Sequence, residues 1–261
     1  MRVRKTVWIF SMAIMFAALV LIVNSRVQLS HEVIIGGADS VFVRSDELKN
    51  PLDDYSSMEG GKRIGGLNYP DINISDWQYI LINSENPSTT YEPDLLEINE
   101  SGMYFAKYAM ANLKNLLAAA KEEGFTPYVN SAYKSYSTQQ FAFTNKANQL
   151  SKDGTYSYNE AVEIAKTIIA YPGTSDHQTG LGVDIVDDQY IELDYSKMDH
   201  AFFKWMDENC AKYGFIKRYP SNKEEITGWD EPWHYRYVGI DAATFIMEHN
   251  LCLEEFIDYY D

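Results

Sequence analysis

The chain has 261 residues, of which 46% are hydrophobic and 23% charged, so it is large enough for one medium domain with an extension, or two small domains. Its formal net charge is −16. A broad basic surface that could neutralise phosphates is therefore not expected, which argues against a nucleic-acid partner, and we interpret the acidity as an aid to solubility.

The N-terminus has the pattern of a membrane anchor. Arg2, Arg4 and Lys5 precede a run without charges from Thr6 to Val23. As a helix this run would be roughly 27 Å long, close to the bilayer core of about 30 Å. The basic flank favours a cytoplasmic N-terminus. We therefore predict that residues 1–24 are a basic flank and single-pass anchor, which places the rest of the chain outside the cytoplasm.

Two other interpretations of this segment exist. A cleaved signal peptide also begins with basic residues and an apolar run, but the following "NSRVQLS" has no clear A-x-A cleavage site. A buried helix of a soluble domain would not explain the terminal position and the basic flank. Residues 25–76 contain "KNPLDDYSSMEGGKRIGGLNYPD", rich in Gly, Pro, Asp and Ser, and are predicted to be an extracytoplasmic linker or stalk.

Residues 77–261 are predicted to form the folded domain, with strands and helices interspersed. Apolar residues at spacings of three and four predict a long helix over 102–123, which Gly124 would end. Strands are expected at 77–83, 126–135, 180–186, 214–220 and 233–239, and further helices at 136–150, 158–170, 199–213 and 241–260. The order shows no regular βαβα repeat, so we predict an α+β fold with a small, mostly antiparallel sheet flanked by helices.

The two cysteines do not form a metal-binding pair. Cys210 and Cys252 lie far apart in the sequence, without C-x-x-C spacing, which argues against a thiolate zinc site. Outside the cytoplasm they could form a disulfide if their Cα atoms lay within about 7 Å. Two separate buried thiols are equally consistent with the sequence.

The segment "GTSDHQTGLGVD", at 173–184, contains the first half of a candidate metal site. His177 and Asp184 are seven residues apart, and Gly180 and Gly182 between them permit a tight turn that would bring the two side chains together. Asp184 lies within an apolar strand pattern. A buried carboxylate there is costly unless it is paired or binds a cation.

The second half lies in "GWDEPWHYRYVG", at 228–239, where His234 follows Glu231 by three residues. Two histidines and one aspartate can give Zn²⁺ three protein ligands and leave the fourth position open, as in catalytic zinc sites. Glu231 could then move protons for hydrolysis. A histidine taken alone is more often a surface residue or a satisfied core residue than a metal ligand, so the interpretation depends on the joint pattern. H-E-x-x-H and G-x-S-x-G motifs are absent from the sequence.

Taken together, these motifs resemble those of a known family. "SDHQTGLGVDI" at 175–185 resembles the S-x-H-x-x-G-x-A-x-D signature of zinc D,D-carboxypeptidases of the VanY type, and "EPWHYRYVG" at 231–239 is similar to their E-x-W-H motif. "SAYKSYSTQ" at 131–139 resembles the family segment S-G-Y-R-S-x-x-x-Q, and "LINSENP" at 81–87 its usual entry into the domain. The resemblance covers about residues 77–240.

The resemblance implies a small α+β domain that holds one zinc and removes the C-terminal D-alanine from peptidoglycan stem peptides or their precursors. It also implies a role for each matching residue. His177, Asp184 and His234 would be the zinc ligands, and Glu231 would be the general base and acid. Ser175 would help to hold the substrate carboxylate, and Gln139 would line the substrate cleft.

This chain departs from the family pattern at Lys134, where the family usually has arginine. That arginine is thought to stabilise the developing oxyanion; lysine keeps the charge but loses the planar, bidentate fork. We expect Lys134 to act electrostatically, although a solvated lysine in a turn is the alternative. At Ala132 and Gly182 the family often has Gly and Ala, and the sequence predicts little consequence.

The sequence therefore predicts a membrane-anchored zinc D,D-carboxypeptidase. An L,D-carboxypeptidase or a peptidoglycan endopeptidase would use the same metal ligands and remains an alternative. A non-catalytic module that binds the cell wall is a further alternative, although the retention of three ligands and Glu231 argues against it.

Overall fold

The computed structural model describes residues 63–64, 67–188, 193 and 201–260. The predicted anchor at 1–24 and most of the predicted linker lie outside these residues. The chain divides into two compact units, Met1–Lys49 and Asn50–Asp261, and every described residue belongs to the second. Within the described ranges, none of the helices has both the length and the apolar composition needed to span a bilayer.

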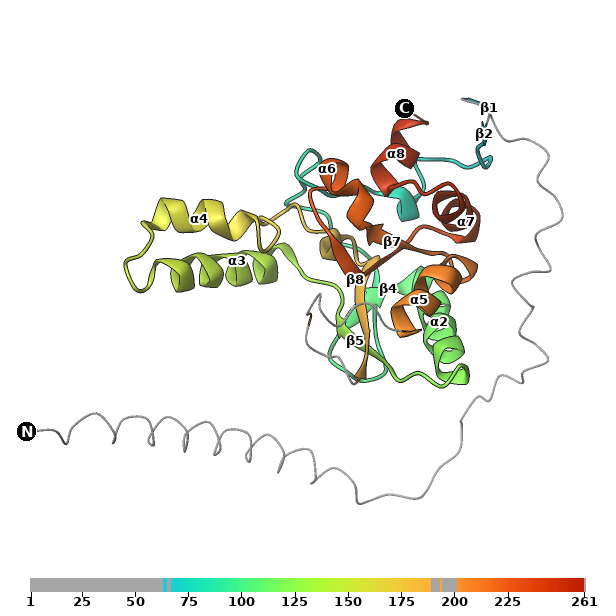
Figure 1. The fold of residues 1–261 in the computed structure, drawn as a ribbon, viewed down its shortest axis with the longest axis horizontal. Coiled ribbons are helices and arrows are strands. Elements are labelled where there is room, and N and C mark those ends of the chain that lie inside the picture. Colours follow the sequence, from blue (N-terminus) through green and yellow to red (C-terminus); the bar gives the residue numbers. More distant parts are fainter. Residues whose placement is uncertain (1–62, 65–66, 189–192, 194–200, 261) are drawn as a thin grey trace, which may run out of the picture. The chain divides into compact units, whose positions relative to one another are not determined.

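A four-stranded antiparallel sheet forms the centre of the fold (Figure 1). Its spatial order is β5 (Pro127–Ser131), β6 (Gly182–Asp187), β8 (Glu231–Tyr237) and β7 (Phe215–Tyr219). Every residue of β6 is buried, so the sheet is covered on both faces at this strand. The predicted α+β fold with an antiparallel sheet is confirmed.

Helices and two short hairpins surround this sheet. The helices are α2 (Met110–Glu122), α3 (Tyr136–Ser151), α4 (Tyr158–Lys166), α5 (Ala201–Asn209), α6 (Glu224–Thr227), α7 (Ile240–Glu248) and α8 (Leu253–Asp258). The hairpins pair β1 (Arg63–Ile64) with β2 (Leu67–Asn68), and β3 (Leu95–Glu97) with β4 (Tyr104–Ala106). Short 3₁₀ turns, including η3 (Trp77–Tyr79), η5 (Asp176–Thr179) and η8 (Cys210–Tyr213), connect these elements.

The core consists of two main clusters. In the first, the buried stripe of α2, with Leu113 and Leu116, packs with β6 and with Phe202 of α5. In the second, α7 and α8 pack on Ile216 of β7. Apolar burial of this kind is the main favourable contribution to folding, and here β6, all of whose residues are buried, lies at the centre of the core.

Helices α3 and α4 form a hairpin that projects from the sheet (Figure 1). They pack on each other through a small cluster that contains Phe143, Ala147 and Ala165. Each begins with a serine cap: Ser135 accepts a hydrogen bond from the Thr138 amide at 3.1 Å, and Ser157 forms a capping box with Glu160. The caps fix where each helix begins, and the hairpin leads into residues 167–170, which line a cavity.

The structure differs from the sequence prediction in two segments at the start of the domain. Residues 77–83 are not a strand: they begin with the 3₁₀ turn η3, and the carbonyls of Gln78 and Ile80 accept hydrogen bonds from the side chain of Arg236 instead of from a strand. The helix predicted over 102–123 starts only at Met110. The residues before it form β4, which follows Gly102 at φ 74° and pairs with β3, and then the 3₁₀ turn η4 (Lys107–Ala109).

The folded unit also begins earlier than the predicted boundary at residue 77. Tyr69 is buried against Phe245 and Tyr259, and it stacks on the Tyr259 ring with the centroids 3.3 Å apart. Cys210 and Cys252 are both buried and free, so they form no disulfide. Burial raises the pKa of each thiol to about 12, which makes both thiols unreactive.

Candidate metal centre

Strand register and a tight turn bring three side chains together. Asp184 of β6 and His234 of β8 are directly paired across the sheet. His177 lies in η5, which ends at Gly180 in the left-handed region, with φ 72°, so that the chain turns back into β6. A Cβ on Gly180 would lie 2.9 Å from Cγ of Pro93. The turn therefore requires glycine both for its backbone angle and for space.

The ligand atoms of His177, Asp184 and His234 all lie within 4.8 Å of one another, and all three residues are buried. Nε2 of His177 is 3.4 Å from Oδ2 of Asp184, and Nδ1 of His234 is 2.8 Å from Oδ1 of the same carboxylate. Two imidazole nitrogens and one carboxylate oxygen converging on one point form a donor set that suits Zn²⁺. The residues present therefore fit the predicted ion.

The protonation of the two histidines bears on metal binding. Burial lowers the pKa of His177, which favours the neutral imidazole that a metal needs. Burial also lowers the pKa of His234, but its contacts with Asp176 and Asp184 outweigh this and raise it to about 9. A metal ion binding at Nδ1 of His234 must therefore displace a proton from that ring.

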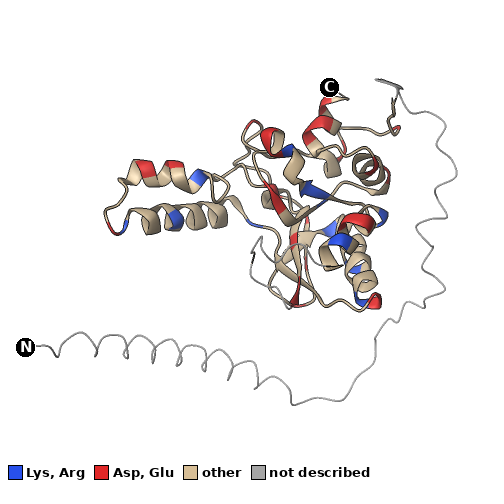
Figure 2. Ribbon diagram, viewed as in Figure 1, with Lys and Arg blue, Asp and Glu red and all other residues tan. Residues whose placement is uncertain are grey.

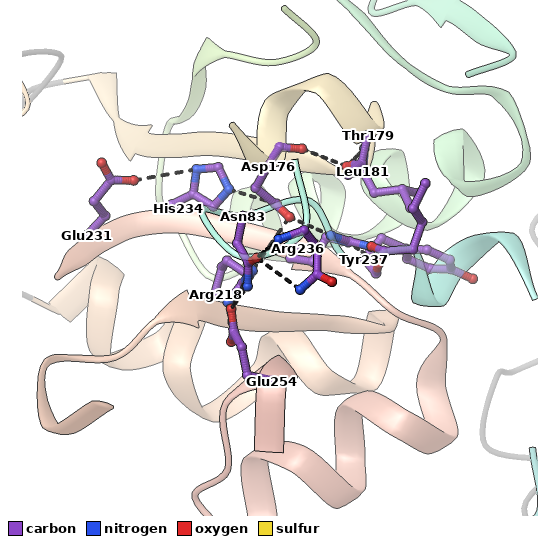
Figure 3. A network of polar contacts seen from close by, with 12 residues as sticks. Asn83, Asp176, Thr179, Leu181, Arg218, Glu231, His234, Arg236, Tyr237 and Glu254 are labelled. Atoms are coloured by element: carbon purple, nitrogen blue, oxygen red, sulfur yellow. Dashed lines mark hydrogen bonds and ion pairs between the residues drawn. The ribbon is translucent and has the colours of Figure 1, made fainter. Parts of the chain in front are cut away.

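Glu231 lies at the start of β8, next to these ligands. Its Oε2 is 3.8 Å from Nδ1 of His234 (Figure 3), and a quarter of its side chain is exposed. Burial raises the pKa of Glu231 to about 7, although the positive charges of His234 and Lys134 oppose this rise. A carboxyl group that titrates near neutral pH is suited to accept and return a proton.

A cavity of about 530 Å³ opens onto the site. The three ligand residues and Glu231 lie on one side of it, and the rest of its wall comes from α3, from residues 167–170 and from the loop that carries Trp229. Side chains of Tyr219 and Trp233 complete the wall. The cavity therefore combines a polar floor with aromatic sides, which is the usual composition of a ligand site.

Lys134, Ser175 and Gln139 also line this cavity. Lys134 is half-buried, and its positive charge acts through space on both His177 and Glu231. Ser175 is 4% exposed. Nε2 of Gln139 donates to the carbonyl of Ala170 at 2.7 Å, while its Oε1 is buried without a hydrogen-bond partner among the described residues. The structure thus brings all seven predicted site residues to one cavity.

The sequence prediction did not include a group of buried charges behind His234. Asp176, Arg218, Arg236 and Glu254 are buried and paired with one another (Figure 3). Two signals could have revealed them: Asp176 directly precedes His177, and Arg236 is two residues after His234, on the same face of a strand. A buried arginine in a strand needs an anionic partner.

These features, a buried His–Asp–His group that can hold a metal ion and a titratable carboxyl group that lines the same cavity, are those of a metallohydrolase. The family model for VanY, described as D-alanyl-D-alanine carboxypeptidase, matches residues 102–240, which is more than half of the chain. The chain therefore belongs to the VanY D-alanyl-D-alanine carboxypeptidase family, as the sequence motifs indicated.

Individual relatives agree with this assignment. A D-alanyl-D-alanine carboxypeptidase of Enterococcus faecalis is 40% identical over 184 residues, a match that spans 70% of this chain and 66% of the relative. A zinc-bound variant of the vancomycin resistance D,D-pentapeptidase VanY superposes with a TM-score of 0.61 at 40% identity, over 70% of this chain and 99% of that one. The LD-carboxypeptidase LdcB superposes with a TM-score of 0.61 at 36% identity, over 76% and 93%.

Proposed function

We propose that the chain is a zinc D,D-carboxypeptidase that removes the C-terminal D-alanine from peptidoglycan stem peptides or their precursors. The observation that carries this proposal is the convergence of the ligand atoms of His177, Asp184 and His234 within 4.8 Å, at a cavity that also contains Glu231. The zinc-bound VanY neighbour supports the choice of metal.

A zinc ion held by these three residues would supply Lewis acidity, which polarises the scissile carbonyl and makes water acidic enough to attack at neutral pH. Glu231 takes a proton from the attacking water as the oxygen bonds to the carbonyl carbon. It then returns this proton to the amide nitrogen as the carbon–nitrogen bond breaks and D-alanine leaves. Burial raises the pKa of Glu231, which makes its carboxylate a stronger base for the first step and its carboxyl group available for the second.

Lys134 supplies positive charge on the cavity side of the site. Because its charge acts on both Glu231 and His177, it can also stabilise negative charge that develops on a carbonyl oxygen bound in this cavity. Ser175 and Gln139 are the groups proposed to bind the substrate. The hydroxyl of Ser175 can donate to the terminal carboxylate, and the free Oε1 of Gln139 can accept from an N–H of the peptide.

An L,D-carboxypeptidase is the second candidate function. The LdcB neighbour, at 36% identity, favours it as an alternative. The two activities differ in the stereochemistry of the residue before the scissile bond, so the cavity wall and not the metal distinguishes them. We further propose that residues 1–24 anchor the enzyme in the membrane, because a basic flank and an uncharged run at the N-terminus favour an extracytoplasmic domain.

The test is to incubate the full chain with zinc and with tri-, tetra- and pentapeptide stems, and to identify the products by mass spectrometry. The proposal predicts that the pentapeptide loses one alanine and that the other two stems remain intact. Loss of alanine from the tetrapeptide alone would establish the L,D alternative. No cleavage of any stem by zinc-loaded protein would contradict both.

A further inference from the structure

We propose that Asp176 is a positioning residue for the metal. Its carboxylate accepts a hydrogen bond from the Nε2–H of His234, which leaves Nδ1 of that ring as the metal-binding nitrogen. This inference rests on the metal site proposed above. It concerns a residue that does not itself reach the metal position, because its carboxylate contacts the opposite side of the His234 ring.

The contacts of the His234 ring define the two sides. Oδ2 of Asp176 lies 3.1 Å from Nε2, whereas Nδ1 faces Asp184 at 2.8 Å and Glu231 at 3.8 Å (Figure 3). A neutral imidazole carries a proton on one nitrogen only. If a metal takes Nδ1, the proton must be on Nε2, where Asp176 is the acceptor. Carboxylates in this position orient a ligating histidine and make it a stronger ligand.

Two arginines keep Asp176 an anionic acceptor in a site without solvent. Its other oxygen, Oδ1, accepts from Nη1 of Arg236 at 2.5 Å and lies 3.5 Å from Nε of Arg218. All three side chains have an exposed fraction of 0%. One oxygen thus serves the arginines and leaves the other for His234, so the carboxylate is fixed at both ends. A buried carboxylate without such partners would be neutral and a weaker acceptor.

Arg236 itself is held by the start of the domain. Its Nη2 donates to the carbonyls of Ile80 and Gln78, at 2.5 and 3.1 Å. Arg218 is held from the other side by Glu254 of α8, through bonds of 2.6 and 2.8 Å. The support for His234 therefore comes from segments distant in sequence. Of the two arginines, Arg236 is the one bonded directly to Asp176, and it is held by these two carbonyls. Arg218 is the one held by Glu254.

Gly182 provides the space for this contact. A Cβ at residue 182 would lie 2.5 Å from Oδ2 of Asp176 and 2.8 Å from Nε2 of His234. A methyl group would thus meet both partners of this contact from the side. The sequence predicted little consequence from glycine at this position; in this structure an alanine would require Asp176 or His234 to shift.

The experiment compares zinc affinity, measured on the full chain by competition with a chromogenic chelator, among three proteins: the wild type, Asp176→Asn and Glu254→Gln. Both substitutions remove one buried carboxylate from the same arginine, Arg218, but only the first removes it from His234. We expect Asp176→Asn to weaken zinc binding by about 10- to 100-fold. Glu254→Gln should keep the affinity of the wild type.

If Asp176→Asn binds zinc as tightly as the wild type, the inference is wrong. It is also wrong if Glu254→Gln loses as much zinc affinity as Asp176→Asn, because that result would indicate general destabilisation. If Asp176→Asn does not fold, Gly182→Ala tests the same contact with every charge retained. This variant should also weaken zinc binding. If folded Gly182→Ala binds zinc with wild-type affinity, the inference about Asp176 is wrong. Failure of the wild type to bind zinc would refute the proposed function itself.

Discussion

The two sides of the metal site differ in how their polar groups are satisfied. On the sheet side, Asp176, Arg236 and His234 are fully buried and bonded to one another. On the cavity side, Gln139 keeps an oxygen without a partner among the described residues, and Lys134 is half-buried. On the sheet side, Nε of Arg218 also lacks a hydrogen-bond partner among these residues, although it lies 3.5 Å from Oδ1 of Asp176. The unpaired oxygen of Gln139 fits the substrate-binding role proposed for this residue, whereas the bonded groups on the sheet side hold the metal ligands.

The distribution of charge follows the same division. Helices α3 and α4 have few charges (Figure 2): Lys146 on α3, and Glu160, Glu163 and Lys166 on α4. Strands β7 and β8, in contrast, carry the buried arginines Arg218 and Arg236. The buried charges behind the sheet therefore stabilise the positions of the metal ligands. Substitutions on the sheet side should therefore change metal affinity first, and substitutions on the cavity side should change turnover or substrate binding while zinc remains bound.

The largest effect on the cavity side is expected from Glu231→Gln. The amide keeps the size of the side chain but cannot accept a proton, so kcat should fall by about 10²- to 10⁴-fold. Zinc content, measured by atomic absorption, should stay at the wild-type level. Turnover near the wild-type rate would show that Glu231 is not the base.

The next largest effect is expected from Lys134→Met. Removal of the positive charge should lower kcat by about 10²- to 10³-fold, with little change in KM, if the charge acts in the transition state. Lys134→Arg is the matched control because it keeps the charge and adds a planar fork. It should retain most of the activity; an equal loss in both variants would indicate a purely steric role.

The pH dependence sharpens the same distinction. Glu231 must be deprotonated to act as a base, so kcat/KM should fall as the pH drops through the pKa of Glu231. This pKa is about 7 without metal, and a bound cation lowers it. Since Lys134 also lowers it, the acidic limb of the profile should move to higher pH in Lys134→Met. If the acidic limb of the profile is unchanged in Lys134→Met, the charge of Lys134 does not act on Glu231.

A smaller effect is expected from Gln139→Leu, which removes the free Oε1 but retains a similar volume. One hydrogen bond to the peptide should be lost, which raises KM by up to about tenfold. The thermal midpoint of the variant provides the control, because Nε2 also bonds to Ala170. A large loss of stability without a change in KM would assign Gln139 a structural role only.

The parts of the site that the sequence could predict are those encoded by local spacing. His177 and Asp184 flank a glycine turn, and Glu231 and His234 share one short motif, so their chemistry could be inferred without a structure. The contact of Asp176 with His234 could not, since it depends on the register between β6 and β8 and on the space at Gly182. The strand predicted at 77–83 was wrong for a similar reason. The backbone carbonyls of Gln78 and Ile80 bind the side chain of Arg236, a tertiary contact that local sequence does not reveal.

The most direct test of the account is the zinc content of the purified chain, compared with that of His177→Ala and Asp184→Ala. Three ligands that converge on one ion predict about one zinc per wild-type chain and less than a tenth of that in either variant after dialysis. A wild-type chain without zinc, or variants that retain a full equivalent, would contradict the claim that these side chains share a metal.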